Sequence, residues 1–148
     1  MPERSFTHTV KAMAGIETAW RALQDEKTWG AVGGVDRVWD AVHNTAGELR
    51  GYQFTATAGR QYEGSAEVVQ SVRGERMAVA ITTSEVEGQI AVALRPTDQG
   101  HTEVAVTLDL RSKGWLSTAL FPVVAAAVGS GLPANVESFA RRIEATVG

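Results

Sequence analysis

The feature that most constrains this chain is the order in which its sequence patterns follow one another. An alternating stretch at residues 5–10 precedes a short helical pattern at about residues 15–24. A long run of alternating strands comes next, and the C-terminus is helical with one apolar stripe. This order predicts an α+β fold, in which a curved antiparallel sheet of about seven strands wraps around a long C-terminal helix. Such a sheet often encloses a pocket.

The clearest hairpin of the predicted sheet follows residue 52. Phe54 and Ala56 share one face of the first strand, and Gly64 and Ala66 share one face of the second. With residues 59–61 as a three-residue loop, Phe54 faces Ala66 and Ala56 faces Gly64. Large side chains then meet small ones on the apolar face, while the other face is polar.

Further strands are expected at regular spacing, with apolar residues alternating at 77–81, 90–94 and 104–110. Residues 28–34 contain three glycines and predict a loop between the first helix and the second strand. We expect that second strand at residues 35–42.

The second strand has two possible facings. If Trp39 points inward, Arg37 and His43 line the pocket and could bind a polar head group. If Val38 and Val42 point inward, Arg37 is a solvated charge. The second facing is favoured because a buried unpaired arginine is costly, although Trp39 is kept among the candidate lining residues.

The C-terminal region carries no charged residue between positions 114 and 136. Pro122, Pro133 and the Gly-Ser-Gly sequence at 129–131 interrupt it, so a membrane-spanning helix is disfavoured against a helix that roofs the pocket. The 129–131 break would either hinge this roof or mark a helix–turn–helix entry into the long helix. Residues 115–121, from Trp115 to Phe121, are a possible contact for a membrane or a partner enzyme.

Composition excludes several classes of function. A net charge of −3 with scattered basic residues argues against nucleic acid as a partner. The chain has no cysteine, hence no disulfide and no zinc–thiolate site, which fits a cytoplasmic location. The first 14 residues lack the apolar core of a signal peptide. The three histidines are far apart in sequence, so no metal site is expected.

Three short motifs carry a family resemblance. Residues 62–69 (YEGSAEVV), 100–104 (GHTEV) and 113–116 (KGWL) resemble strand and helix-entry motifs of proteins related to an accessory subunit of carbon monoxide dehydrogenase. The whole chain, residues 1–148, resembles a single ligand-binding domain of the SRPBCC superfamily. This superfamily has the helix-grip fold of START lipid-transfer domains, plant pathogenesis-related allergens and polyketide cyclases. One departure is Gly33-Gly34-Val35, where relatives often carry Pro-Gly-Val.

The resemblance implies that a hydrophobic small molecule, such as a lipid, quinone or polyketide, binds between the sheet and the long helix. We expect binding or carriage without a cofactor, a metal or catalytic residues. The expected lining residues are Trp39, Tyr52, Phe54, Ala56, Tyr62, Ala66, Val79, Ile81, Val92, Val106, Leu108, Phe121, Val124, Val136 and Phe139. Aromatic residues among them would form either a pocket wall or ordinary core.

Two alternatives to carriage stay open. A polyketide cyclase or dehydratase would need an acid or base facing the pocket, and His43, Tyr52, Tyr62 and Asp109 are the available groups. An accessory protein that assembles a partner enzyme or tethers it to a membrane would use residues 115–121.

Overall fold

The computed structural model describes residues 3–58, 60–97, 99–113 and 121–145, with side chains in the last range described from residue 129 onward. Seven antiparallel strands form one sheet in the order β1-β7-β6-β5-β4-β3-β2. The strands are β1 (Glu3–Ala12), β2 (Arg37–His43), β3 (Leu49–Ala58), β4 (Arg60–Val72), β5 (Arg76–Thr83), β6 (Val86–Pro96) and β7 (Thr102–Ser112). The helices are α1 (Ile16–Ala22), α2 (Glu26–Gly33) and α4 (Phe121–Ala145).

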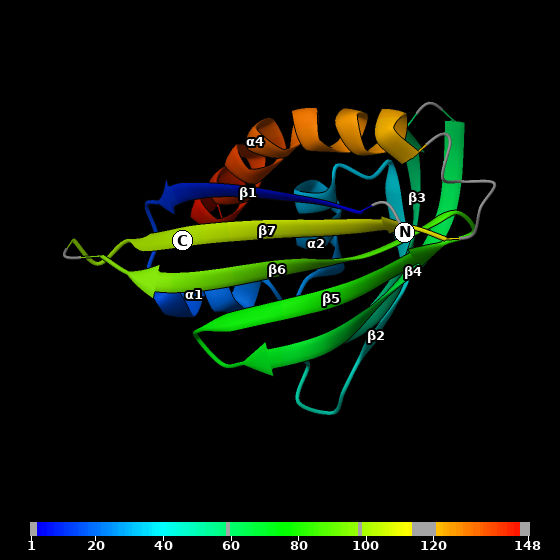
Figure 1. Cartoon of the computed structure of the whole chain (residues 1–148). Coiled ribbons are helices and arrows are strands. Elements are labelled where there is room, and N and C mark those ends of the chain that lie inside the picture. The colour runs from blue at the N-terminus through cyan, green and yellow to red at the C-terminus, as the bar shows by residue number, and fades with distance from the viewer. Residues whose placement is uncertain (1–2, 59, 98, 114–120, 146–148) are drawn as a thin grey trace.

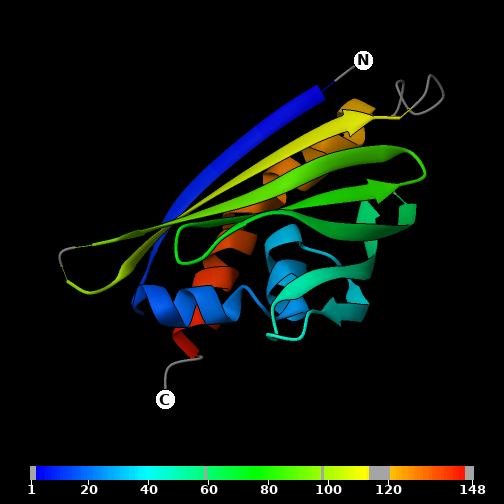
Figure 2. The ribbon, with the colours of Figure 1, turned by 90° about the horizontal axis from the view of Figure 1, so that it is seen from below.

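The sheet is strongly curved, and the helices lie on its concave side (Figures 1 and 2). Helix α4 runs beside β1 and packs against both β1 and α2. This arrangement confirms the predicted α+β fold of a curved seven-stranded sheet with a long C-terminal helix.

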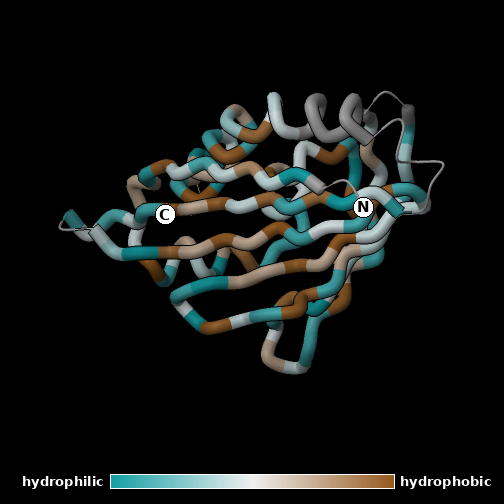
Figure 3. Tube along the Cα trace, in the orientation of Figure 1, coloured by the Kyte–Doolittle hydropathy of each residue, from teal (hydrophilic) through white to brown (hydrophobic). Residues whose placement is uncertain are grey.

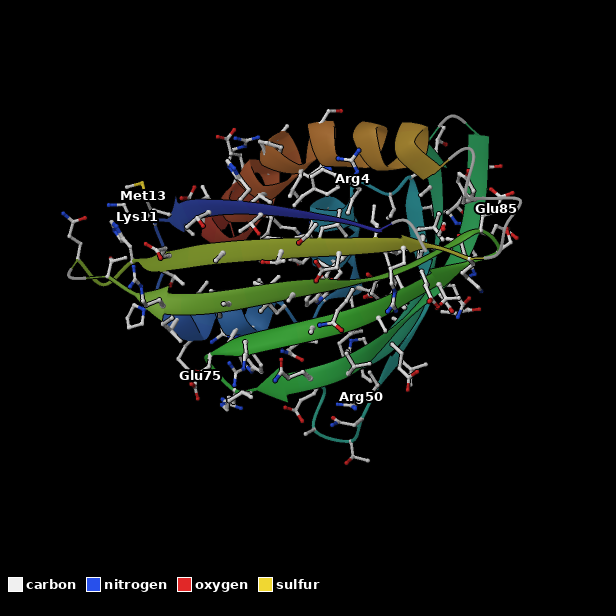
Figure 4. All side chains as sticks on the ribbon, viewed as in Figure 1. Arg4, Lys11, Met13, Arg50, Glu75 and Glu85 are labelled. Atoms are coloured by element: carbon white, nitrogen blue, oxygen red, sulfur yellow. The ribbon has the colours of Figure 1, made fainter. Side chains whose placement is uncertain are left out.

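Strand β7 alternates between buried and more exposed positions along its whole length, and apolar and polar residues are interleaved along the sheet in Figure 3. In β7 the residues Val104, Val106, Leu108 and Leu110 are buried, while Asp109 is exposed. Charged side chains project from the turns and ends of the sheet, where Figure 4 labels several of them. One face of the sheet therefore supplies the core.

The β3–β4 hairpin is offset by two residues from the predicted register. Phe54 pairs with Gly64 rather than Ala66, and Ala56 pairs with Tyr62. The ladder continues to Ala58 and Arg60, so the connection is shorter than the expected three-residue loop. The rule that large residues face small ones still holds, because the Phe54 ring lies over a glycine.

The predicted loop at residues 28–34 is wrong, because helix α2 covers most of it. Asp25 caps the helix start by accepting a hydrogen bond from the Lys27 backbone at 2.9 Å. Gly34 ends the helix in the left-handed conformation, with φ of 65°. Between them Trp29 and Val32 are fully buried. Burial of this short apolar face outweighs the low helix propensity of the glycines.

Strand β2 changes its facing along its length. Val38 pairs with Phe54 and packs against the core, whereas Trp39 points to the outer face with the Arg37 guanidinium 4.5 Å from its ring centroid. The register then shifts after Trp39, next to Asp40 with φ of 50°, and Val42 is 58% exposed. The predicted inward orientation is therefore confirmed for Val38 and is wrong for Val42.

Helix α4 is continuous through residues 129–131, so the predicted break there is wrong. A side chain at Gly129 would collide with the Phe6 ring of β1, so the glycine allows close packing of helix on strand. The inner stripe of α4 is buried and consists of Leu132, Val136, Phe139 and Ile143. No helix in the part of the chain that the structure describes is long and apolar enough to cross a membrane.

Candidate functional site

A cavity of about 90 Å³ lies between the concave face of the sheet and helix α2. Its walls come from β3 to β7, from α2 and from the segment that joins α2 to β2. The described lining residues are Trp29, Gly33, Val35, Tyr52, Phe54, Ala56, Tyr62, Ile81, Thr83, Val86, Ile90, Leu108 and Leu110. Nearly all of these side chains are apolar, so the cavity suits an apolar occupant.

The cavity lies at the end of the sheet where β5 turns into β6. Ile81 and Leu110 belong to one cross-strand row, and Ile90 and Leu108 belong to the next. Val106 lies in the following row and no longer lines the cavity. The far end of the same face is ordinary packed core.

The structure places the predicted lining residues in four groups. Six of them line the cavity: Tyr52, Phe54, Ala56, Tyr62, Ile81 and Leu108. Six others are buried core beyond its walls: Ala66, Val79, Val92, Val106, Val136 and Phe139. Trp39 lies on the outer face, beside a shallow polar hollow. Phe121 and Val124 belong to α4, but their side chains lie outside the described set.

Sequence reasoning missed several lining residues for two reasons. Trp29 and Gly33 lie four positions apart on the stretch that was predicted as a loop, and only its helical spacing could have indicated them. Ile90 and Leu110 occupy the same face as residues that were predicted, so the missing information was which end of the sheet holds the cavity. The sheet register supplies that information.

Most polar groups in the wall are satisfied within the protein. The Trp29 indole Nε1 donates to the Leu23 carbonyl at 2.8 Å. The Thr83 hydroxyl donates to the Val86 carbonyl at 3.1 Å and accepts from the Val86 backbone N–H at 3.0 Å. These bonds hold the wall together and leave little polar surface for a ligand.

Tyr52 differs from the other polar residues of the wall. The residue is only 4% exposed, and no hydrogen bond joins its hydroxyl to the described residues. Burial raises the pKa of the Tyr52 phenol well above its ordinary value, so the group stays neutral into the alkaline range. The Phe54 ring lies beside it, with centroids 6.4 Å apart and planes tilted by 60°.

Only two of the four groups that could serve acid–base chemistry reach the cavity. Tyr52 and Tyr62 line the cavity, but Asp109 is exposed on the outer face. His43 is exposed too, and one of its ring nitrogens lies 2.9 Å from the Gln24 carbonyl.

Among the described residues, no three His, Asp or Glu side chains gather closely enough to hold a metal ion. The predicted contact surface at residues 115–121 lies outside the description, except for the backbone of Phe121.

Solved structures resemble this chain over nearly its full length. A START superfamily protein from Mycobacterium smegmatis has a TM-score of 0.68 at 14% identity, covering 97% of this chain and 96% of its own. A protein from Thermus thermophilus has a TM-score of 0.73 at 14% identity, covering 98% and 100%. The Zhui aromatase/cyclase from Streptomyces sp. R1128 has a TM-score of 0.62 at 14% identity, covering 98% and 88%. No protein-family model and no curated protein matches the sequence.

Proposed function

From the START-like helix-grip fold of this chain, we propose that it binds and carries a hydrophobic small molecule in the cavity between sheet and α2. The observation that carries the proposal is an apolar cavity whose described lining residues come mainly from five strands and one helix, with most of their polar groups bonded internally. A wall of this kind holds a ligand by apolar contact and excludes water.

The energetics of an apolar cavity favour its being filled. At about 24 cal/mol per Å³, a closed and dry cavity of this size costs roughly 2 kcal/mol of folding stability; this cavity is partly open, so the cost is smaller. A ligand that fills the void recovers part of this cost and adds RT ln(1 + [L]/Kd) to the free energy of unfolding.

The volume limits the size of the occupant. An engineered cavity of about 150 Å³ is known to bind benzene, and the cavity here is smaller, at about 90 Å³. A single ring or the end of an apolar chain fits with modest outward movement of the wall. A multi-ring polyketide or a complete lipid chain requires the walls to move further apart.

Carriage is preferred to catalysis because of where the polar groups lie. Of the four candidate acid–base groups, His43 and Asp109 lie outside the cavity. This leaves two tyrosines, with no carboxylate or imidazole among the described lining residues to act as a general base. The assembly or tethering role through residues 115–121, and the cytoplasmic location, stay predictions.

Native mass spectrometry of freshly purified protein tests the proposal, followed by solvent extraction of whatever is released. We expect either a retained apolar molecule, or a rise in melting temperature when benzene or another single-ring compound is added. Ala56→Phe should abolish the rise because the new ring occupies the cavity. Gln53→Phe is the matched control, since Gln53 is exposed on the opposite face of the same strand. A protein that retains nothing and is stabilised by no probe would sink the proposal.

A further inference from the structure

The Tyr52 hydroxyl is the polar feature of the cavity wall that apolar carriage leaves unexplained. Tyr52 lines the cavity, the residue is 4% exposed, and its hydroxyl makes no hydrogen bond to the described residues. The hydroxyl oxygen is not one of the fully buried side-chain atoms without a partner, so it keeps some accessible surface. Buried tyrosines usually find a hydrogen-bond partner, and in an otherwise apolar wall this hydroxyl points to a polar group on the ligand.

The neighbouring polar groups cannot substitute for Tyr52. The Trp29 indole N–H is engaged by the Leu23 carbonyl, and the Thr83 hydroxyl by the backbone of Val86. Tyr62 has an interaction of its own, whereas the Tyr52 hydroxyl makes no hydrogen bond to the described residues.

The protonation state of Tyr52 determines which hydrogen bonds its hydroxyl can make. A phenol has an ordinary pKa of about 10, and burial raises that of Tyr52 further, so the hydroxyl carries a proton to donate at physiological pH. The phenolic oxygen can also accept a hydrogen bond, so the hydroxyl suits an uncharged polar group on the ligand. A carbonyl oxygen is the group that uses its proton, whereas a charged group would be poorly solvated by an otherwise apolar wall.

We propose that Tyr52 orients the ligand by donating a hydrogen bond to a carbonyl oxygen, which makes the ligand class a compact aromatic or apolar ketone, quinone or ester. This inference rests on the proposed function and deepens it. The tilted rings of Tyr52 and Phe54 give the aromatic part of such a ligand an edge-to-face contact beside the hydroxyl.

A matched pair of probes tests the inference. Acetophenone and α-methylstyrene have nearly the same shape and differ by a carbonyl oxygen in place of a methylene group. Calorimetric titration of the wild-type protein should show acetophenone binding about tenfold more tightly, the ratio expected for one buried hydrogen bond. In Tyr52→Phe this ratio should fall to about one, with α-methylstyrene binding unchanged or strengthened.

Infrared spectroscopy gives a second readout that does not depend on the variant. The carbonyl stretch of acetophenone should shift to lower frequency when it binds the wild-type protein, and the shift should be absent in Tyr52→Phe. If both probes bind the wild type equally and the carbonyl band does not shift, the inference is overturned while the proposed function stands. If neither probe binds, nor any other apolar compound, the proposed function fails as well.

Discussion

The ring of Phe54 on β3 lies directly over Gly64, its register partner on β4. A Cβ placed at Gly64 would lie 2.5 Å from the Phe54 Cζ atom and 2.6 Å from the Thr82 carbonyl oxygen. Real Cβ atoms do not approach other atoms so closely, and the carbonyl cannot move without disturbing β5. The glycine therefore allows the aromatic wall of the cavity to lie flat on the sheet.

Gly64→Ala should accordingly destabilise the fold by about 1–3 kcal/mol, the usual range for overpacking. Urea unfolding measures this change. Ser65→Ala is the control, because Ser65 is exposed on the opposite face and should change stability by less than about 0.5 kcal/mol. Equal stability of Gly64→Ala and wild type would mean that Phe54 moves aside without cost.

The strands of this fold could be predicted because a period of two distinguishes the core face from the solvent face. Ile90 and Val92 in β6 are buried as that alternation requires, whereas in β5 Ala78 is buried together with Met77 and Val79. The hairpin register was not predictable in the same way. Whether Phe54 lies opposite Ala66 or opposite Gly64, the same residues stay on the same face of the sheet. The alternation therefore cannot distinguish the two registers.

The cavity was only half predictable for a related reason. Alternation identifies the residues on the concave face but not where along the sheet the packed core stops. Leu108 lines the cavity and Val106 does not, although the two are equivalent in the sequence pattern. Trp29 was missed because a glycine-rich stretch resembles a loop unless the Asp25 cap and the left-handed Gly34 are both recognised.

Two adjacent glycines at the end of α2 should respond oppositely to alanine. A Cβ at Gly33 would meet Val35 and Ile90 at 3.5 and 3.6 Å, which is ordinary contact, and its φ is not left-handed. Gly33→Ala should stabilise the fold by about 0.4–1 kcal/mol, because it restricts the unfolded chain. The new methyl group also adds bulk to the cavity wall, so single-ring probes should bind more weakly.

Gly34→Ala provides the contrast, measured in the same urea unfolding series. Its φ of 65° and the amide of Asn135 on α4 both oppose a side chain. We expect a loss of at least about 1–2 kcal/mol from the left-handed conformation alone. Stabilisation by both substitutions would show that the helix end is not held as described.

Asp25 both caps helix α2 and forms an ion pair, and substitutions at this residue can separate the two contributions to stability. One Asp25 oxygen accepts from the Lys27 backbone at 2.9 Å, and the other lies 3.1 Å from Arg142 on α4. The Arg142 and Asp25 side chains are 37% and 45% exposed, so solvent screens their attraction. Asp25→Asn keeps the cap and should cost less than about 0.5 kcal/mol, whereas Asp25→Ala should cost about 1 kcal/mol. Equal losses in thermal unfolding would mean that the charge, not the cap, matters.

Stability at alkaline pH should depend on Tyr52. Burial raises the pKa of its phenol in the folded state above the ordinary value of about 10. Below about pH 10, the phenol is protonated in both the folded and the unfolded protein, so its contribution to stability is fully present. Above that pH the phenol ionises only in the unfolded chain. The free energy of unfolding then falls as the pH rises, by up to about 1.4 kcal/mol per pH unit.

Urea unfolding of the wild type and of Tyr52→Phe isolates this contribution. It is measured at successive pH values from 8 to 11, about the range that brackets the pKa of an exposed phenol. Other titrating groups are common to both proteins, so the difference between the two curves reports Tyr52 alone. The wild type should lose stability relative to the variant as the pH passes the ordinary phenol value. Parallel curves would show that Tyr52 ionises in the folded protein as readily as in the unfolded chain, and that burial does not raise its pKa.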